Sequence, residues 1–355
     1  MRHAFSMLLM AAIACGDTSE DRADAATSSQ ARDAAPPPTL VLDTRARKLA
    51  TSASHTCSLR KTGLFCWGAN EKGQLGDASS QSSSVPVHAS VAGDDVVEVA
   101  VHTARTCVRK KTGKVACWGA NANGQLGDGT RTDSVEAVVP DVDNVKQLAL
   151  DETTTCALRG DGSVWCWGAA PETSDAGSIE PTALANVEGA VDLHSGGMNT
   201  YCVRLMEGAP KCWHMQGGAW TTPTEATALL DASVIALASA QSVCGVVSSG
   251  EVVCQDLASG MSVALQGSRG TTALEGGLLT LCGGDNAGAW YSWSILSPAL
   301  LQTIGAQRRE LSRGPFFEFS TAAYRYCGLE AGGQVQCMES NAAPAHFSPV
   351  AELPE

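Results

Sequence analysis

The 355-residue sequence is poor in charged residues, and above all in basic ones. Only 17% of its residues are charged, and 24 Lys and Arg stand against 37 Asp and Glu, a net charge of −13. The chain therefore lacks the basic surface with which a nucleic-acid-binding protein displaces counterions. It has only 6 Phe and 4 Tyr but 36 Gly, and 44% of its residues are hydrophobic. This composition favours a turn-rich all-β protein with a sizeable core.

The first fifteen residues have the pattern of an export signal. Arg2 and His3 precede an apolar run of 11 residues, Ala4 to Ala14, which is too short for a permanent membrane-spanning helix. The run ends in Ala12-Ile13-Ala14-Cys15, which resembles the bacterial lipobox and implies a lipid anchor on Cys15. A plain signal peptide with an incidental Cys15 is the alternative. Gly16, in place of the aspartate associated with inner-membrane retention, favours the outer membrane or the cell surface.

Residues 16–46 have the composition of a disordered tether. They are rich in Ala, Ser and acidic residues, contain the Pro36-Pro37-Pro38 run, and hold almost no large apolar residue before Leu40. Burial cannot offset the entropy of ordering such a segment. We therefore predict a signal peptide at 1–15, a disordered linker at 16–46 and one folded domain at 47–355. As a flexible coil, the linker would hold that domain roughly 30 Å from the membrane.

The fourteen cysteines reveal an internal repeat. Twelve of them form six pairs with a separation of 9 or 10 residues, and the first members recur every 38 to 50 residues when Cys282 is included. The pairs are Cys57/Cys66, Cys107/Cys117, Cys156/Cys166, Cys202/Cys212, Cys244/Cys254 and Cys327/Cys337. A period of about 40–50 residues is typical of propeller blades. Seven first cysteines predict seven repeats.

Each repeat has the pattern of a small antiparallel sheet. An apolar strand such as Val96 to Ala100 precedes the first cysteine, a Gly-containing turn follows it, and a half-buried second strand leads to the second cysteine. The two cysteines would face each other across a hairpin, within disulfide distance. We predict six disulfides and an extracytoplasmic location. Zinc binding is the alternative, although no Cys-x₂₋₄-Cys spacing occurs. Cys282, opposite Ser292, is expected to be a buried thiol, with an intermolecular bridge as the alternative.

The first two repeats carry the longest motifs. The segments Cys66 to Asp77 (CWGANEKGQLGD) and Cys117 to Thr130 (CWGANANGQLGDGT) resemble the repeat of the RCC1 family, the regulator of chromosome condensation. His55-Thr56-Cys57 resembles the exported bacterial branch of that family. The resemblance extends over 48–355 and weakens along the chain. It implies a seven-bladed β-propeller, in which each blade hides its faces against its neighbours.

Closing such a ring requires a latch. The segment Phe347 to Leu353 resembles Ser84 to Val87, which lies before the second repeat. We therefore predict that this C-terminal strand completes the sheet begun by Lys48 to Ala50, so that no sheet edge is left open.

Few residues indicate a binding or catalytic site. Trp220, Trp290 and Trp293 lie in degenerate repeats and are the expected partner-binding residues, because aromatic anchors dominate protein interfaces. The tryptophans Trp67, Trp118, Trp167 and Trp213 share one repeat position and are expected to stack between blades.

Other candidate chemistry is weak. His55, His102 and His194 could form a ring on one face, although histidines there more often cap loops. The Asp141-x-Asp143 spacing hints at calcium but lacks a full ligand set. Neither a P-loop nor a His-Glu-x-x-His nor a Gly-x-Ser-x-Gly motif occurs, so no catalytic residue, metal or cofactor is predicted.

These observations predict a membrane-anchored, extracytoplasmic scaffold that binds a protein or glycan and no nucleic acid. Loops on a rigid propeller are free to specialise in binding. Two alternatives stay open: an extracytoplasmic enzyme acting on polysaccharide at the central channel, and a structural envelope protein without a discrete ligand.

Overall fold

A computed structural model describes residues 48–350, except 169–177, 217–218, 240, 278–279, 288, 295–308, 313–315, 323–324, 331–333 and 340–347. The predicted signal peptide with Cys15 and the predicted linker 16–46 lie outside the described residues. Within the described part, we find no helix with the length and apolar character needed to cross a membrane.

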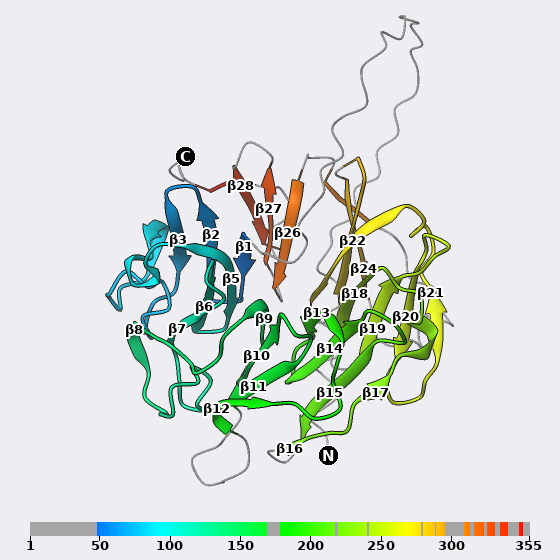
Figure 1. Ribbon diagram of the computed structural model, residues 1–355. Coiled ribbons are helices and arrows are strands. Elements are labelled where there is room, and N and C mark those ends of the chain that lie inside the picture. The colour runs from blue at the N-terminus through cyan, green and yellow to red at the C-terminus, as the bar shows by residue number, and fades with distance from the viewer. Residues whose placement is uncertain are drawn as a thin grey trace, which may run out of the picture.

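The described strands form seven antiparallel sheets arranged around a central axis (Figure 1). Each sheet consists of consecutive strands, ordered from the axis to the rim. The innermost strands contact one another in a closed circle, because the first lies beside the last. They are β1 (Leu49–Thr51), β5 (Val96–His102), β9 (Val145–Leu150), β13 (Ala190–Ser195), β18 (Val234–Ser239), β22 (Thr271–Gly277) and β26 (Phe316–Ala322). The fold is an all-β propeller.

The second and third strands of each sheet form the cysteine hairpins. The second strands are β2 (His55–Arg60), β6 (Arg105–Lys110), β10 (Thr154–Arg159), β14 (Thr200–Leu205), β19 (Ser242–Val246), β23 (Thr280–Asp285) and β27 (Arg325–Glu330). The third strands are β3 (Gly63–Gly68), β7 (Val115–Gly119), β11 (Val164–Gly168), β15 (Lys211–Gln216), β20 (Val252–Asp256), β24 (Trp290–Ser294) and β28 (Val335–Glu339).

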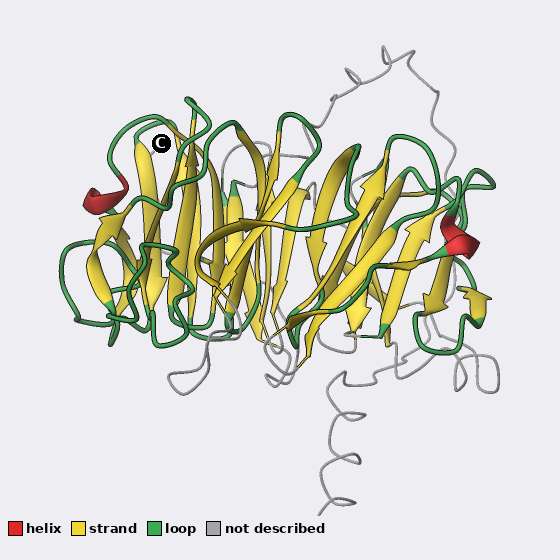
Figure 2. Ribbon diagram, turned by 60° about the horizontal axis from the view of Figure 1, so that its bottom comes forward, coloured by secondary structure: helices red, strands yellow, loops and turns green. Residues whose placement is uncertain are grey.

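Short outer strands complete the sheets at the rim. They are β4 (Ser83–His88), β8 (Ser134–Val138), β12 (Ser178–Ala183), β16 (Ala219–Trp220), β17 (Thr224–Glu225), β21 (Ser262–Ala264), β25 (Arg309–Ser312) and β29 (Ser348–Pro349). Both β16 and β17 pair with β15. Two 3₁₀ turns, η1 (Ser90–Ala92) and η2 (Thr227–Leu229), lie in connections to the next sheet. In Figure 2 the strands stand side by side as a disc, with loops at both ends.

The core lies between the sheets. One cluster joins Leu75 and the Cys57–Cys66 disulfide of the first sheet to Val108 and Trp118 of the second. All five residues of β7 are buried, whereas β4 at the rim is half-buried or exposed throughout. The expectation of half-buried middle strands was therefore wrong in part, because a sheet packed between two neighbours buries both of its faces.

The predicted disulfides are present in the structure. Each of the six cysteine pairs lies in direct register across its hairpin and is bonded, with Cα–Cα distances from 3.9 to 4.2 Å. The bonds are Cys57–Cys66, Cys107–Cys117, Cys156–Cys166, Cys202–Cys212, Cys244–Cys254 and Cys327–Cys337. The bonded sulfurs are not available to a zinc ion.

Cys282 is the one cysteine of the described sheets without a bond. It pairs in register with Ser292 and is a buried free thiol, as predicted. Burial and the nearby Glu275 raise the pKa of this thiol well above its usual value.

The predicted C-terminal latch was wrong for its described residues, 348–350, whereas 347 and 351–353 lie outside the described residues. Strand β29 pairs with β28, at the rim of the last sheet, whereas β1 lies at the axis and pairs with β2. The ring closes through side chains instead. Glu318 Oε1 on β26 accepts the backbone N–H groups of Lys48 and Leu49, both at 2.8 Å. Ser320 Oγ accepts the N–H of Thr51 at 3.0 Å.

The Gly-Gln-Leu-Gly motifs receive the tryptophan of the next sheet. Trp118 Nε1 donates to Gln74 O at 3.1 Å, and Trp167 Nε1 donates to Gln125 O at 3.0 Å. A Cβ atom on Gly76 would lie only 2.7 Å from Trp118 Nε1. The predicted stacking of these tryptophans between sheets is confirmed for both, and the glycine makes the close approach possible.

Candidate functional site

The innermost strands surround a cavity of about 520 Å³ at the centre of the disc. It extends from apolar residues within the strands, such as Ala100 and Leu148, to the loops that follow their C-terminal ends. The segments Ser52–Ala53, His102–Thr103, Asp151–Glu152 and Ser195–Met198 line it there. We call this end the channel mouth. The mouth brings together loops from four sheets, and the cavity as a whole is lined by residues from all seven.

A buried polar network supports the channel mouth between the second, third and fourth sheets. Arg105 is 1% exposed, and its Nη2 donates to Asp151 O and Thr154 O, both at 2.8 Å. Tyr201 is fully buried, and its hydroxyl donates to Thr154 O at 3.1 Å. Burial lowers the pKa of Arg105 to about 10, so its guanidinium remains charged at neutral pH. These contacts fix the backbone that carries Asp151.

Asp151 is the most unusual carboxyl group of this site. Its side chain is fully buried, Oδ1 accepts the N–H of Glu152 at 2.7 Å, and the backbone N–H groups of Gly197 and Asn199 also face the carboxylate. Burial raises its pKa to about 6, although backbone N–H groups and the charge of Arg105 act in the opposite direction. A buried carboxyl with a raised pKa beside a cavity is typical of a functional site.

The loop after β13 adopts a rare backbone conformation. Gly197, Met198 and Asn199 all have positive φ, at 84°, 54° and 56°. Such angles cost a residue other than glycine about 1 kcal/mol or more. Asn199 Oδ1 offsets this cost by accepting the N–H of Thr153 at 3.2 Å and the hydroxyl of Thr154 at 3.0 Å. The loop holds Met198, 69% exposed, at the channel mouth.

The three histidines of the expected ring have different environments. His102 and His194 line the cavity. Burial lowers the pKa of His102 to about 3, helped by the charges of Arg105 and His55, so this imidazole is neutral. Nε2 of His194 lies 3.3 Å from Asp192 Oδ2. Burial by itself would raise the pKa of Asp192, but His194 and Arg204 lower that pKa to about 2.

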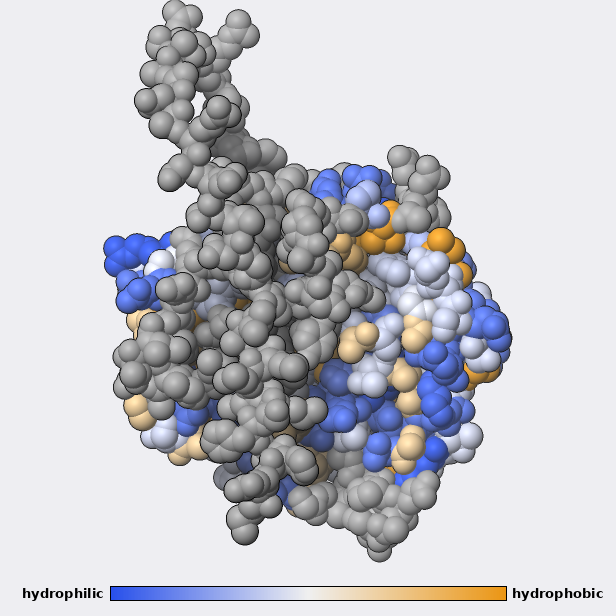
Figure 3. All heavy atoms as spheres, turned by 180° about the vertical axis from the view of Figure 1, so that it is seen from behind, coloured by the Kyte–Doolittle hydropathy of each residue, from blue (hydrophilic) through white to orange (hydrophobic). Residues whose placement is uncertain are grey.

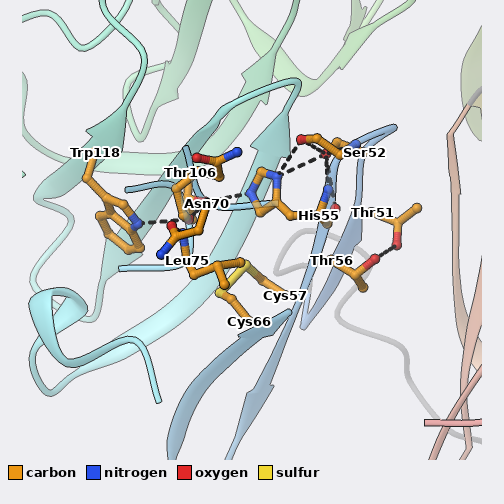
Figure 4. The surroundings of a disulfide bond; sticks show 12 residues. Thr51, Ser52, His55, Thr56, Cys57, Cys66, Asn70, Leu75, Thr106 and Trp118 are labelled. Atoms are coloured by element: carbon orange, nitrogen blue, oxygen red, sulfur yellow. Dashed lines mark hydrogen bonds between the residues drawn. A yellow bond between two sulfur atoms is a disulfide. The ribbon is translucent and has the colours of Figure 1, made fainter. Parts of the chain in front are cut away.

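His55 is a structural residue (Figure 4). It is fully buried, and its Nε2 is hydrogen-bonded to Thr106 Oγ1 on the next sheet at 2.8 Å. Thr106 uses its hydroxyl hydrogen to bind Gln74 O at 2.7 Å, so His55 must be the donor. His55 therefore braces two sheets. Among the described residues, no three His, Cys, Asp or Glu side chains are grouped as a metal site.

The twelve bonded cysteines form the frame of the sheets and do not take part in the site. None of them lines the cavity, which is bordered by the innermost strands and the loops after them. The second cysteine of each pair lies on a third strand, two strands out from the axis: Cys66, Cys117, Cys166, Cys212, Cys254 and Cys337. Cys166, Cys212 and Cys254 are at most 2% exposed, whereas Cys337 in the last sheet is half-buried. Their role is structural, and they offer a ligand no reactive thiol.

The tryptophans expected to contact a partner are not exposed. Trp290 is 4% exposed and Trp293 only 1%, and their Nε1 atoms donate to Phe316 O and Gln266 O, both at 3.3 Å. Both are buried between sheets rather than open to a partner: Trp293 packs against the preceding sheet, as the repeat tryptophans do, whereas Trp290 packs against the following sheet. Trp220 is half-buried, with its ring edge-on to Tyr201 at 5.9 Å. None of the three lines the cavity.

Exposed hydrophobic residues are scattered over the described surface (Figure 3). The large ones are spread over several sheets: Val85, Val135, Val139, Met198, Met206, Leu230 and Met261. Of these, only Met198 lies at the cavity.

The sequence analysis missed Arg105, Asp151 and Asn199. One signal could have indicated Arg105: it stands two residues before the first cysteine of its pair, where the first and third repeats have His55 and Thr154. The burial of Asp151 depends on packing between sheets, which sequence spacing does not give.

Comparison with known proteins points to one repeat type. Two models of the regulator of chromosome condensation (RCC1) repeat match residues 46–74 and 63–108. Human Protein RCC2 is 35% identical over 85 residues, which are 23% of this chain and 16% of that protein. The Xenopus laevis RCC2 homolog is 36% identical over 85 residues, 17% of its length. The matched segment thus spans under a fifth of these relatives.

Solved structures share the whole architecture at low identity. The Saccharomyces cerevisiae protein Prp20p has a TM-score of 0.63 at 15% identity, with 81% of this chain and 85% of that chain covered. Yeast RCC1 (Prp20) in its complex with Kap60 has a TM-score of 0.65 at 14% identity, with coverage of 95% and 91%. At such identities the likeness concerns the fold alone. The chain thus has an all-β propeller fold, and its residues 46–108 match the repeat of the regulator of chromosome condensation.

Proposed function

We propose that this protein is an exported, lipid-anchored scaffold that binds a protein partner outside the cytoplasm. In this proposal Cys15 carries the lipid, residues 16–46 form the tether, and the channel mouth is the centre of the binding face. The propeller supplies a rigid platform, and the loops at the mouth supply the specificity.

The observation that carries this proposal is the set of six disulfides, one in each of six sheets. Structural disulfides persist in oxidising compartments and are rare in the cytosol. The six disulfides recur at one repeat position and are in register, which supports the proposal that the chain folds after export. The lipobox-like end of the apolar run, at Cys15, supports an anchor rather than free secretion.

Protein binding is supported by the fold and by the channel mouth. Prp20p binds Gsp1p and histones, and yeast RCC1 (Prp20) forms a complex with Kap60. Those partners belong to the yeast protein and are not transferred to this chain. For this chain, the supporting features are a rigid cavity, an exposed Met198 held in a costly conformation, and a buried carboxyl group beside it.

The anchor is tested by metabolic labelling with a radioactive fatty acid. We expect the wild-type protein to be labelled and to sediment with membranes, and Cys15→Ala to be unlabelled. Separation of inner from outer membranes then tests the expected outer-membrane or surface location. An unlabelled wild-type protein would exclude the lipid anchor and leave the plain signal peptide.

The binding face is tested by pull-down of a stoichiometric protein from envelope extract. Met198 and Met206 are a matched pair, because they are 69% and 78% exposed and lie beyond opposite ends of β14. We expect Met198→Glu to lose the partner and Met206→Glu to retain it. If both variants lost the partner equally, or both retained it equally, the channel mouth would be excluded as the binding face. Turnover on a glycan panel, without a protein partner, would support the enzyme alternative instead.

A further inference from the structure

Basic side chains gather at one end of the disc, on the first two sheets. The innermost strands end at the channel mouth, so the opposite end, which we call the far end, carries their starts and the turns between second and third strands. The first two sheets are neighbours in the ring (Figure 1). Six residues at their far end form a group that we call the basic sector: Lys48, Arg60, Lys61, Lys110, Lys111 and Lys114.

The residues around the basic sector do not cancel its positive charge. Lys61, Lys111 and Lys114 are exposed, and none of them forms an ion pair among the described residues. Two exposed carboxylates, Asp94 and Asp95, lie beside the sector, where the backbone carbonyl of Asp95 accepts the N–H of Lys111 at 2.8 Å. Six basic residues against these two are a local excess in a chain of net charge −13. Such a surface attracts an anion.

The chain enters the propeller at the same end. Lys48 is exposed, and its carbonyl accepts the N–H of Leu59 at 2.7 Å, next to the turn between Arg60 and Gly63. In the proposed function, residues 16–46 lead from the membrane to this point, so the tether brings the basic sector toward the lipid. The field of an anionic membrane acts on basic residues only within about a Debye length, roughly 10 Å at 0.1 M salt. A sector beside the attachment point is therefore well placed to reach it.

We infer that the basic sector rests on the phosphate groups of an anionic membrane and orients the disc so that the channel mouth faces away from the bilayer. This inference rests on the proposed function, because the lipid on Cys15 brings the sector to the membrane. The orientation follows from the topology, since each innermost strand runs from the far end to the mouth. A partner would then approach the mouth from the aqueous side. A lipid anchor and a basic patch are two signals that together give stable attachment.

Acylation of lysines tests the inference on the purified, lipidated protein. The protein is placed in vesicles of phosphatidylcholine, either alone or with roughly three parts in ten of phosphatidylglycerol, and reacts with a water-soluble amine-directed ester. Mass spectrometry then measures the labelling of each lysine. We expect labelling of Lys61, Lys111 and Lys114 to fall at least about threefold on the anionic vesicles and to recover in about 1 M salt. Lys72 is the internal control, because its side chain is 50% exposed and it lies between β3 and β4 at the mouth end.

A pair of double variants tests which charges act. Lys111→Glu with Lys114→Glu should raise the labelling of Lys61 on anionic vesicles by about twofold or more, because the sector loses its attraction to the lipid. Lys72→Glu with Arg131→Glu is the matched control, since it makes the same change of charge in two loops at the mouth end. It should leave the protection of Lys61 unchanged.

Equal labelling of the wild-type protein on the two kinds of vesicle would overturn the inference, as would equal protection of Lys72. Protection of the basic sector by a captured protein, and not by vesicles, would assign it to a protein interface and overturn the inference as well. A wild-type protein that incorporates the fatty acid but shows equal labelling keeps its anchor and loses only the orientation. A wild-type protein without the lipid would refute the anchor, and the inference with it.

Discussion

Glu318 accepts the backbone N–H of Leu49 at 2.8 Å across 269 residues of sequence and so ties the last sheet to the first. The same device recurs in the ring. Glu98 Oε1 accepts the N–H of Leu148 at 3.0 Å, and Gln147 Oε1 accepts the N–H of Leu193 at 3.0 Å. Innermost strands are thus tied by side chains that reach the backbone of the neighbouring strand, and at the junction of the last and first sheets such a tie stands in place of the expected shared strand.

Removing this tie should loosen the closure of the ring. Glu318→Ala leaves two backbone donors without an acceptor, and we expect a loss of about 1–3 kcal/mol in the free energy of unfolding. Glu318→Gln keeps a side-chain acceptor and should retain most of the free energy of unfolding that Glu318→Ala loses. Urea unfolding measures both, with Glu225→Ala on the exposed strand β17 as the control. If Glu318→Ala unfolds like the wild-type protein, side-chain closure is wrong.

A seventh disulfide should form at Cys282. This thiol lies in direct register with Ser292, as do the six bonded pairs of the other sheets. We expect Ser292→Cys to be bridged under the oxidising conditions that bridge the six native pairs and to gain about 2–3 kcal/mol in the free energy of unfolding, less any strain. Peptide mapping under non-reducing conditions detects the link, and thermal unfolding gives the gain. A variant with two free thiols in the native protein would show that this hairpin differs from the others.

Asp151 should make stability depend on pH. Burial raises the pKa of Asp151 from 3.8 to about 6. The contribution of this carboxyl group to the free energy of unfolding is therefore fully present below about pH 4 and is lost as the pH rises through 6. From pH 4 to pH 7.5, Asp151→Asn should gain about 2–3 kcal/mol relative to the wild-type protein. Arg105 and Tyr201 face this group and are unchanged in the variant.

Asp231→Asn is the control for this pH dependence, because the pKa of Asp231 is shifted in the opposite direction. Hydrogen bonds from Ser248 lower the pKa of Asp231. The stabilisation of the folded state by the Asp231 carboxylate is therefore present at neutral pH and is lost as the pH falls. Urea unfolding of Asp231→Asn at the same two pH values should show a small shift in the other direction. A flat difference for Asp151→Asn would exclude a raised pKa at Asp151.

Gly76 tests the fit between a Gly-Gln-Leu-Gly motif and the next tryptophan. Gly76 has φ +74°, and an added Cβ would lie 2.7 Å from Trp118 Nε1. We expect Gly76→Ala to cost roughly 2–4 kcal/mol from backbone strain and overpacking together. Gly250→Ala is the control, because its φ of +77° is the same but nothing lies within 4 Å, so only the backbone cost of about 1 kcal/mol applies. Equal losses would mean that the tryptophan contact contributes nothing.

The sequence predicts the parts of this fold that repeat. The cysteine spacing places the hairpins, and register follows because Cys57 and Cys66 can be bridged only when they face each other. The contacts between sheets do not repeat so strictly. Trp293 has lost its neighbouring motif but keeps the buried position of the repeat tryptophans, and Trp290 is buried against the following sheet, so local degeneracy was a poor guide to exposure.

The candidate site was less predictable than the fold. Two of its residues, His102 and His194, follow from matching repeat positions, but Asp151 becomes unusual only when Arg105 and Tyr201 from neighbouring sheets enclose it. The latch was mispredicted because Phe347 to Leu353 resembles a rim strand. A rim strand cannot reach β1 at the axis, and β29 pairs with β28 at the rim instead.

The short span of every disulfide has a consequence for how the chain matures. Each bridge joins two cysteines that are 9 or 10 residues apart and consecutive among the cysteines of the sequence, from Cys57–Cys66 to Cys327–Cys337. A polypeptide threading through a translocation pore would present both thiols of one bridge before the next pair arrives. Oxidation in order of emergence then yields the native pairing directly, without the slow reshuffling that interleaved bridges demand.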